Sequence, residues 1–68
     1  MDLEFREIRI YEKEDGFHVV DNSSKEEICV MSKGDFYKRG IHNSSVEKYN
    51  WKGKDILTVV LNIEYLEE

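Results

Sequence analysis

The residue types that most often bind metals or transfer protons are scarce in this chain of 68 residues. Two histidines and one cysteine are present, at His18, Cys29 and His42. Their spacing demands no metal site, and a lone histidine in a strand or loop is usually a surface residue. We therefore expect no metal and no cofactor.

Other patterns that could support catalysis are incomplete. Gly53-Lys54 resembles the end of a phosphate-binding loop, but Lys48 and Asp55 stand where that loop needs a glycine and a hydroxyl. The serine pairs lack flanking elbow glycines, and the glutamate pairs lack a neighbour that would raise a pKa for acid–base chemistry. These pairs are Ser23-Ser24, Ser44-Ser45, Glu26-Glu27 and Glu67-Glu68. The sequence predicts a protein that is not an enzyme.

Length limits how much apolar surface the chain can bury. A domain near this size hides about 60% of the surface that its unfolded chain exposes, and such folds usually need a staple or a second subunit. With Cys29 as the single cysteine, an intramolecular disulfide is impossible. We expect self-association into a homo-oligomer. We also expect a cytoplasmic protein without membrane contact, because no secretory signal and no run of membrane-spanning length is present.

Charge is distributed unevenly along the chain, whose net charge is −5. Residues 1–32 and 55–68 are acidic, whereas residues 33–54 are basic. Acidic ends repel nucleic acid at long range and favour a basic protein partner. If the carboxylates align along one edge, they imitate a phosphate backbone; the alternative is that they only protect an unpaired edge strand from aggregation. The predicted partner-binding acidic face consists of Glu7, Glu12, Glu14, Asp15, Asp21, Glu26 and Glu64.

The basic middle of the chain contains interleaved aromatic residues, and this suggests a different function. Cations that follow a backbone and rings that stack on bases are typical of proteins that bind single-stranded nucleic acid. This alternative site consists of Lys33, Tyr37, Lys38, Arg39, Trp51, Lys52 and Lys54. The simpler interpretation is structural, because basic residues favour a helix C-terminus and Phe36 would dock a short helix on a sheet.

The elements that must position these residues begin with a β-hairpin. Ile8 and Ile10 alternate with charged residues, and Phe17 and Val19 continue the alternation after Asp15-Gly16. A two-residue loop at Asp15-Gly16 would place these four apolar side chains on one buried face. Because Phe5 is out of step with Ile8, we expect a bend or bulge near residues 6–7.

The stretch "DILTVVLNIEYLEE" predicts a long central strand covered on one side. Its predicted covered face consists of Leu57, Val59, Leu61, Ile63 and Tyr65. A second hairpin joins "VEKYNW" to this strand, with an undetermined loop length. A three-residue loop would put Tyr49 and Trp51 on the Leu57 face, and a two-residue loop on the opposite one.

Two shorter elements lie between the hairpins. "EEICVM" is expected to be a strand, although Ser24 followed by Glu27 could instead begin a helix. Ser32, Asp35 and Gly40 predict a helix near residues 32–39. The predicted fold is one α+β domain over residues 1–68, with a mostly antiparallel sheet of four or five strands, two hairpins and one short helix.

This layout resembles the small acidic inhibitors of uracil-DNA glycosylase that phages encode. The resemblance is one of element order and charge: a hairpin, then "MSKGDFYKRG", then "GKDILTVVLNIEYL". It implies a dimeric protein that imitates DNA, and no functional residue is carried over from it. The chain departs from that layout by the extra segment "IHNSSVEKYNW".

From the sequence we expect a non-enzymatic acidic interaction protein. In its sharpest form, this is a phage or mobile-element inhibitor that binds a basic site on a nucleic-acid-processing enzyme by DNA mimicry. The alternatives are the single-stranded nucleic-acid-binding module and a structural or regulatory subunit of a larger assembly.

Overall fold

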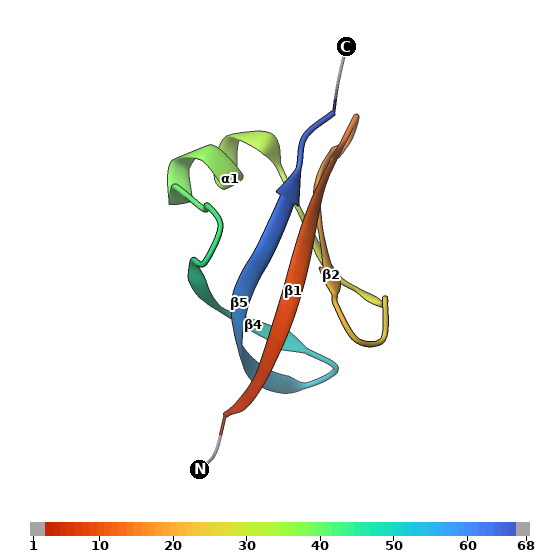
Figure 1. Ribbon diagram of the computed structural model, residues 1–68, viewed down its shortest axis with the longest axis vertical. Helices are drawn as coiled ribbons and strands as arrows, with labels where there is room; N and C mark the ends of the chain where they lie inside the picture. The colour runs from red at the N-terminus through yellow and green to blue at the C-terminus, as the bar shows by residue number, and fades with distance from the viewer. Residues whose placement is uncertain (1–2, 67–68) are drawn as a thin grey trace.

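The fold is a five-stranded sheet with one short helix, in a computed structural model that describes residues 3–66 (Figure 1). The elements are β1 (Glu4–Lys13), β2 (Gly16–Asp21), β3 (Glu27–Met31), α1 (Lys33–Arg39), β4 (Val46–Trp51) and β5 (Lys54–Glu64). The strand order is β3-β2-β1-β5-β4; β1 and β5 run parallel, and the other neighbours are antiparallel. The prediction of a small, mostly antiparallel α+β fold is confirmed. The detail of two hairpins is not, because three consecutive strand pairs are antiparallel.

The turn between β1 and β2 lies one residue earlier than predicted. Lys13 pairs with Gly16, so the two turn residues are Glu14 and Asp15. Gly16 instead begins β2 with a φ of 142°, where an added Cβ would lie 2.4 Å from the carbonyl oxygen of Met31. The close approach of β3 therefore requires a glycine in the strand rather than in the turn.

The apolar face predicted for these two strands is nevertheless correct. The register differs from the prediction by two residues, and side chains alternate with a period of two, so no side chain changes face. Ile8, Ile10, Phe17 and Val19 are fully buried and form the centre of the core.

Helix α1 forms where the sequence predicts it. The Ser32 hydroxyl accepts a hydrogen bond from the backbone N–H of Asp35 at 3.1 Å, and Gly40 ends the helix in the left-handed conformation at φ 64°. Phe36 is 1% exposed, and its ring stacks on Phe17 with centroids 3.7 Å apart and planes 8° from parallel. Through this stack α1 covers the face of the sheet that carries Ile8 and Ile10.

The prediction for the covered face of β5 is wrong over most of its length. Ile56, Thr58 and Val60 are buried, whereas Leu57 and Val59 lie on the opposite face and Leu61 is exposed. Alternation alone could not decide between two faces that are both apolar over residues 56–61. The neighbouring strand decides, because Val60 lies beside Ile8 and therefore faces the same core.

An irregularity near Leu61 then changes the alternation of β5. Ile8 pairs with Val60 and Arg9 with Asn62, so Leu61 is the extra residue of a bulge. Ile63 consequently packs against the core, as predicted. The bulge expected near residues 6–7 of β1 is absent from the described pairing, and Phe5 is out of step only because it points away from the core.

The open questions on β3 and β4 are settled by the pairing. Residues 27–31 form a strand. Trp51 pairs with Lys54, so a loop of two residues joins β4 to β5, and Tyr49 pairs with Ile56 on the core face. Tyr49 packs against the core, and burial raises the pKa of its hydroxyl to about 12.

We predict that Phe36→Ala lowers the free energy of unfolding by about 3–5 kcal/mol, because it removes the aromatic stack and leaves a cavity under α1. Urea denaturation followed by circular dichroism measures this loss. The control is Tyr37→Ala, at a side chain that is 59% exposed, for which we expect a cost of about 1 kcal/mol. Equal losses for the two variants would contradict the assignment of Phe36 as the docking residue.

Candidate interaction surfaces

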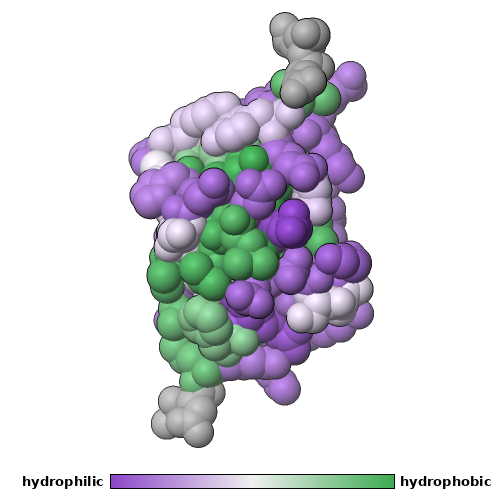
Figure 2. Space-filling view, viewed as in Figure 1, coloured by the Kyte–Doolittle hydropathy of each residue, from purple (hydrophilic) through white to green (hydrophobic). Residues whose placement is uncertain are grey.

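The second face of the sheet has no element packed over it within residues 3–66. The pairing places two rows of side chains there across β1, β5 and β4: Phe5, Leu57 and Lys48 in one row, and Glu7, Val59 and Val46 in the next. We call these six residues the bare face. Phe5 is 58% and Val46 54% exposed, and Figure 2 shows hydrophobic surface over β5 and near the start of β1.

The predicted acidic residues are brought together only in part. Four of them lie at one end of the molecule, where the β1–β2 turn is near the end of β5: Glu12, Glu14, Asp15 and Glu64. Glu12 accepts a hydrogen bond from the backbone N–H of Leu66 at 2.7 Å, and Asp15 pairs with His18. Glu14 and Glu64 are exposed and have no ion-pair partner among the described residues. We call the four residues the acidic end; Glu67 and Glu68 lie outside the described range.

Asp21, which the sequence places in the acidic face, lies in the interior. Its carboxylate accepts hydrogen bonds from the backbone N–H and hydroxyl of Ser24, both at 2.8 Å, and lies 3.4 Å from the Arg6 guanidinium. Burial alone would raise the pKa of Asp21, but the Ser24 and Arg6 contacts outweigh it and the pKa is lowered. Asp21 therefore stabilises the turn after β2 as a buried anion.

The remaining two predicted acidic residues lie apart from the acidic end. Glu26 forms an ion pair with Lys52 at 2.6 Å, and Glu7 belongs to the bare face. The seven carboxylates thus occupy separate places and do not form one row.

The residues of the predicted nucleic-acid site also separate into two groups. Lys33, Tyr37, Lys38 and Arg39 belong to α1, whereas Trp51, Lys52 and Lys54 surround the β4–β5 loop. Figure 1 shows α1 and this loop at different ends of the sheet.

The Trp51 ring makes cation–π contacts with two residues of its own chain. The Arg6 guanidinium and the Lys52 ammonium each lie 4.7 Å from its ring centroid. These cation–π contacts occupy the ring that would stack on a base. In α1, Arg39 pairs with Glu47 at 3.7 Å and Lys33 lies 4.0 Å from Glu12.

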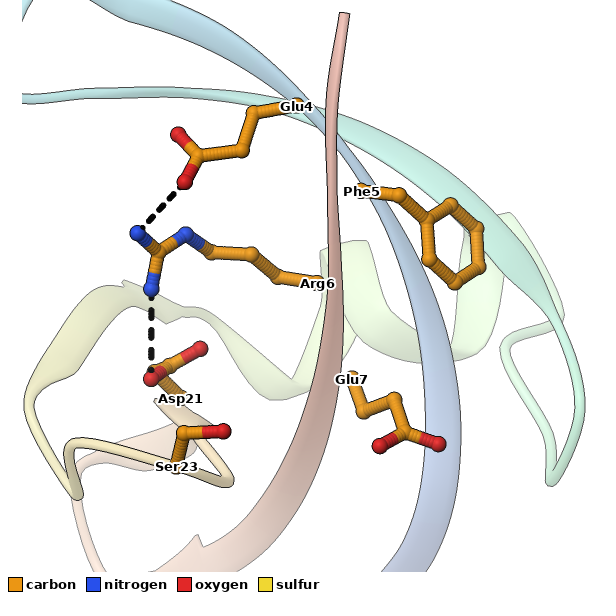
Figure 3. Close-up of a pocket in the computed structure, with 6 residues that line it drawn as sticks. All are labelled: Glu4, Phe5, Arg6, Glu7, Asp21 and Ser23. Atoms are coloured by element: carbon orange, nitrogen blue, oxygen red, sulfur yellow. Dashed lines mark hydrogen bonds and ion pairs between the residues drawn. The ribbon is translucent and has the colours of Figure 1, made fainter.

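A shallow hollow of about 400 Å³ lies beside the first half of β1. It is lined by Glu4, Phe5, Arg6, Glu7, Asp21 and Ser23. Figure 3 shows Arg6 pointing toward Glu4 and Asp21, with Phe5 and Glu7 on the other side of the strand. Arg6 is engaged by both Glu4 and Asp21, so the hollow offers no free anion site. Among the described residues Ser23 makes no side-chain hydrogen bond to a lining carboxylate, so the hollow holds no activated nucleophile.

His18 forms a cluster that the sequence analysis did not predict. Its ring nitrogens lie 2.7 Å from Asp15 and 2.5 Å from Glu27, so the protonated ring connects the β1–β2 turn to β3. The hydrogen bonds to Asp15 and then Glu27 outweigh burial and raise the pKa of His18. The sequence feature that could have predicted this cluster is the spacing of three residues between Asp15 and His18.

The described residues contain no cluster of three or more histidine, cysteine or acidic side chains placed to hold a metal ion. Within the same residues, no helix has the length and apolar character needed to cross a membrane. Comparison of the chain with protein-family models, with curated proteins and with solved structures finds no match.

We predict that stability falls as pH rises above neutrality. Because the folded-state pKa of His18 is raised above 6.5, its contribution is complete below about pH 6.5 and is lost as pH rises through the folded value. Thermal unfolding between about pH 5 and 9 measures this fall. His18→Gln should cost about 1–2 kcal/mol at pH 6 and remove most of the fall, because its charge-assisted hydrogen bonds are lost.

The control for the pH series is His42→Gln, since His42 is exposed and its ring contacts the neighbouring Asn43 carbonyl oxygen and no carboxylate among the described residues. A His42 variant that loses the fall while the His18 variant keeps it would contradict the assignment. At the acid side, the lowered pKa of Asp15 adds stability that is lost as pH falls through its folded value.

Proposed function

We propose that this chain is a non-enzymatic interaction protein that acts by docking through its bare face. The observation that carries the proposal is the set of four apolar side chains in adjacent positions on a sheet face that α1 does not cover: Phe5, Val46, Leu57 and Val59. Monomeric proteins seldom expose a contiguous apolar patch of large size, and such patches mark interaction sites.

The state of the reactive residue types supports a role without catalysis. Both ring nitrogens of His18 are engaged by carboxylates, which leaves neither free to accept a proton from a substrate. Cys29 is half-buried, and burial raises the pKa of its thiol, which disfavours the nucleophilic thiolate.

The acidic end supports a finer form of the proposal, in which the protein partner carries a basic site. Glu14 and Glu64 extend from this end, and the chain has a net charge of −5. A surface built to attract phosphates would attract these carboxylates and accelerate association. We propose inhibition of a nucleic-acid-processing enzyme by DNA mimicry as this finer form, acting in the cytoplasm, where a single cysteine remains reduced.

Direct binding of nucleic acid is the less favoured alternative, because Trp51 already makes cation–π contacts with Arg6 and Lys52 and the basic residues are divided between two places. A role as a structural or regulatory subunit would use the same bare face. The capture experiment below distinguishes that role by the identity of the bound protein.

We predict that the double variant Phe5→Lys/Val46→Glu no longer retains the protein partners that the wild-type chain captures from a lysate. The change keeps the net charge but puts charged groups on the apolar face. The matched control is Tyr37→Lys/Val30→Glu, which makes the same charge changes at exposed side chains outside the bare face. Mass spectrometry of the captured proteins compares the two variants with the wild type. Capture that is equal for all three chains would overturn docking through this face.

We also predict that labelled single-stranded and duplex oligonucleotides show no change in anisotropy when the chain is added to about 100 μM at low salt, because the acidic chain repels phosphates. Salt-sensitive binding would favour the nucleic-acid alternative instead.

For a captured partner with a basic site, Glu14→Gln/Glu64→Gln should slow association several-fold, whereas Lys38→Gln should not.

A further inference from the structure

The bare face has a charge pattern that is complementary to itself. Its six residues form a rectangle with Leu57 and Val59 along the middle strand and four residues at the corners. Phe5 and Val46 occupy one pair of opposite corners, and Glu7 and Lys48 occupy the other pair. One acid and one base therefore lie diagonally across an apolar centre.

We propose that a second copy of this chain covers the bare face, with Glu7 of each copy against Lys48 of the other. The inference rests on the proposed function, since it names the first partner of the same surface. A two-fold symmetric interface brings one patch against itself, so each favourable contact occurs twice.

The two corner charges are available for such a contact. Neither Glu7 nor Lys48 has an ion-pair or side-chain hydrogen-bond partner within residues 3–66. The neighbouring polar groups are satisfied, because Asn50 donates to Asp55 and Arg9 donates to Asn22, both at 3.0 Å. The six residues carry one acid and one base, so the patch adds no net charge of its own to the repulsion between two chains of charge −5.

Only one simple two-fold arrangement pairs these charges. An axis parallel to the strands would place Phe5 over Lys48 and Glu7 over Val46, and an axis across the strands would place Phe5 over Glu7. Each of these buries a charge against an apolar side chain. An axis along the Glu7–Lys48 diagonal would bring like charges together.

An axis along the other diagonal, from Phe5 to Val46, gives the favourable contacts. It places Phe5 near Phe5 and Val46 near Val46 of the other copy, with Leu57 and Val59 between them. It also places both Glu7–Lys48 pairs at the rim. The strands of the two copies then cross steeply, close to the orthogonal class of sheet packing.

A second copy is favoured over an unrelated partner by the small core and by the position of the acidic end. Burying a sheet face adds proportionally more stability to a chain of 68 residues than to a larger domain, because the small chain buries less apolar surface on its own. The bare face lies on the first halves of β1 and β5, whereas the acidic end lies where these parallel strands finish. Self-association therefore leaves Glu14 and Glu64 exposed for a further partner.

A charge-swap series tests the proposal. Sedimentation velocity from about 1 μM to about 1 mM should show a monomer–dimer equilibrium for the wild-type chain. Glu7→Lys and Lys48→Glu should each weaken the dimer about tenfold or more, because each variant alone places like charges together. An equimolar mixture of the two variants, and the double variant Glu7→Lys/Lys48→Glu, should restore it.

The outcomes separate this inference from the proposed function. A wild-type chain that stays monomeric to about 1 mM overturns the inference, yet a partner captured through the bare face would still support the proposed function. A dimer that survives Phe5→Lys/Val46→Glu places the interface elsewhere. A dimer lost in both single variants but not restored by mixing them would overturn the Glu7–Lys48 pairing. Circular dichroism of every variant checks that the fold is retained.

Discussion

The stacking of Phe36 on Phe17 determines which side of the sheet becomes the interior. Phe36 is the buried residue of α1, and through Phe17 it covers the side chains of Ile8 and Ile10. A helix of seven residues can cover only one face of a five-stranded sheet. The opposite face is then left to solvent or to another molecule, so the docking surface is a direct consequence of how little helix the chain contains.

The polar contacts of the molecule follow from the same shortage of covering elements. Thr58 is buried on the core face and donates its hydroxyl hydrogen to the Glu47 carbonyl oxygen at 2.9 Å. At the end of the core face, Arg6 joins Glu4, Asp21 and the ring of Trp51. Ion pairs and a cation–π contact thus stabilise this end of the core face. They also engage several charges that the sequence pattern suggests are free for partners.

Much of the fold could be predicted from sequence because local signals agree with it. The Ser32, Asp35 and Gly40 pattern located α1, and the alternation at Ile8 and Ile10 located the core face of β1. The β1–β2 register was missed by two residues, since the need for Gly16 arises from the approach of Met31, which the local sequence does not reveal. An even error in register does not move side chains between faces, so the core prediction survived it.

The covered face of β5 was not predictable in this way, because Leu57 and Val59 are as apolar as Ile56 and Val60. Only the pairing with β1 separates them. The candidate site was missed for the same reason, since Leu57 and Val59 at its centre were assigned to the covered face.

The acidic residues show a related limit of sequence reasoning. Counting charges finds an excess, but it cannot tell that Asp21 is buried beside Arg6 or that Glu26 pairs with Lys52. The strand pairing places Glu7 on the bare face, and Glu14 and Glu64 remain exposed at the acidic end.

Because β1 and β5 pair in parallel, the bare face and the acidic end lie at different places on the sheet. Parallel strands start at one end of a sheet and finish at the other, so the apolar first halves and the acidic ends cannot coincide. If two copies meet through the first halves, each copy keeps its own acidic end exposed. A dimer then presents two acidic ends, and a partner with two basic sites would bind it more tightly than either end alone, since the second contact forms within the same complex. The arrangement of one pair of strands thereby connects self-association to the recognition of a basic partner.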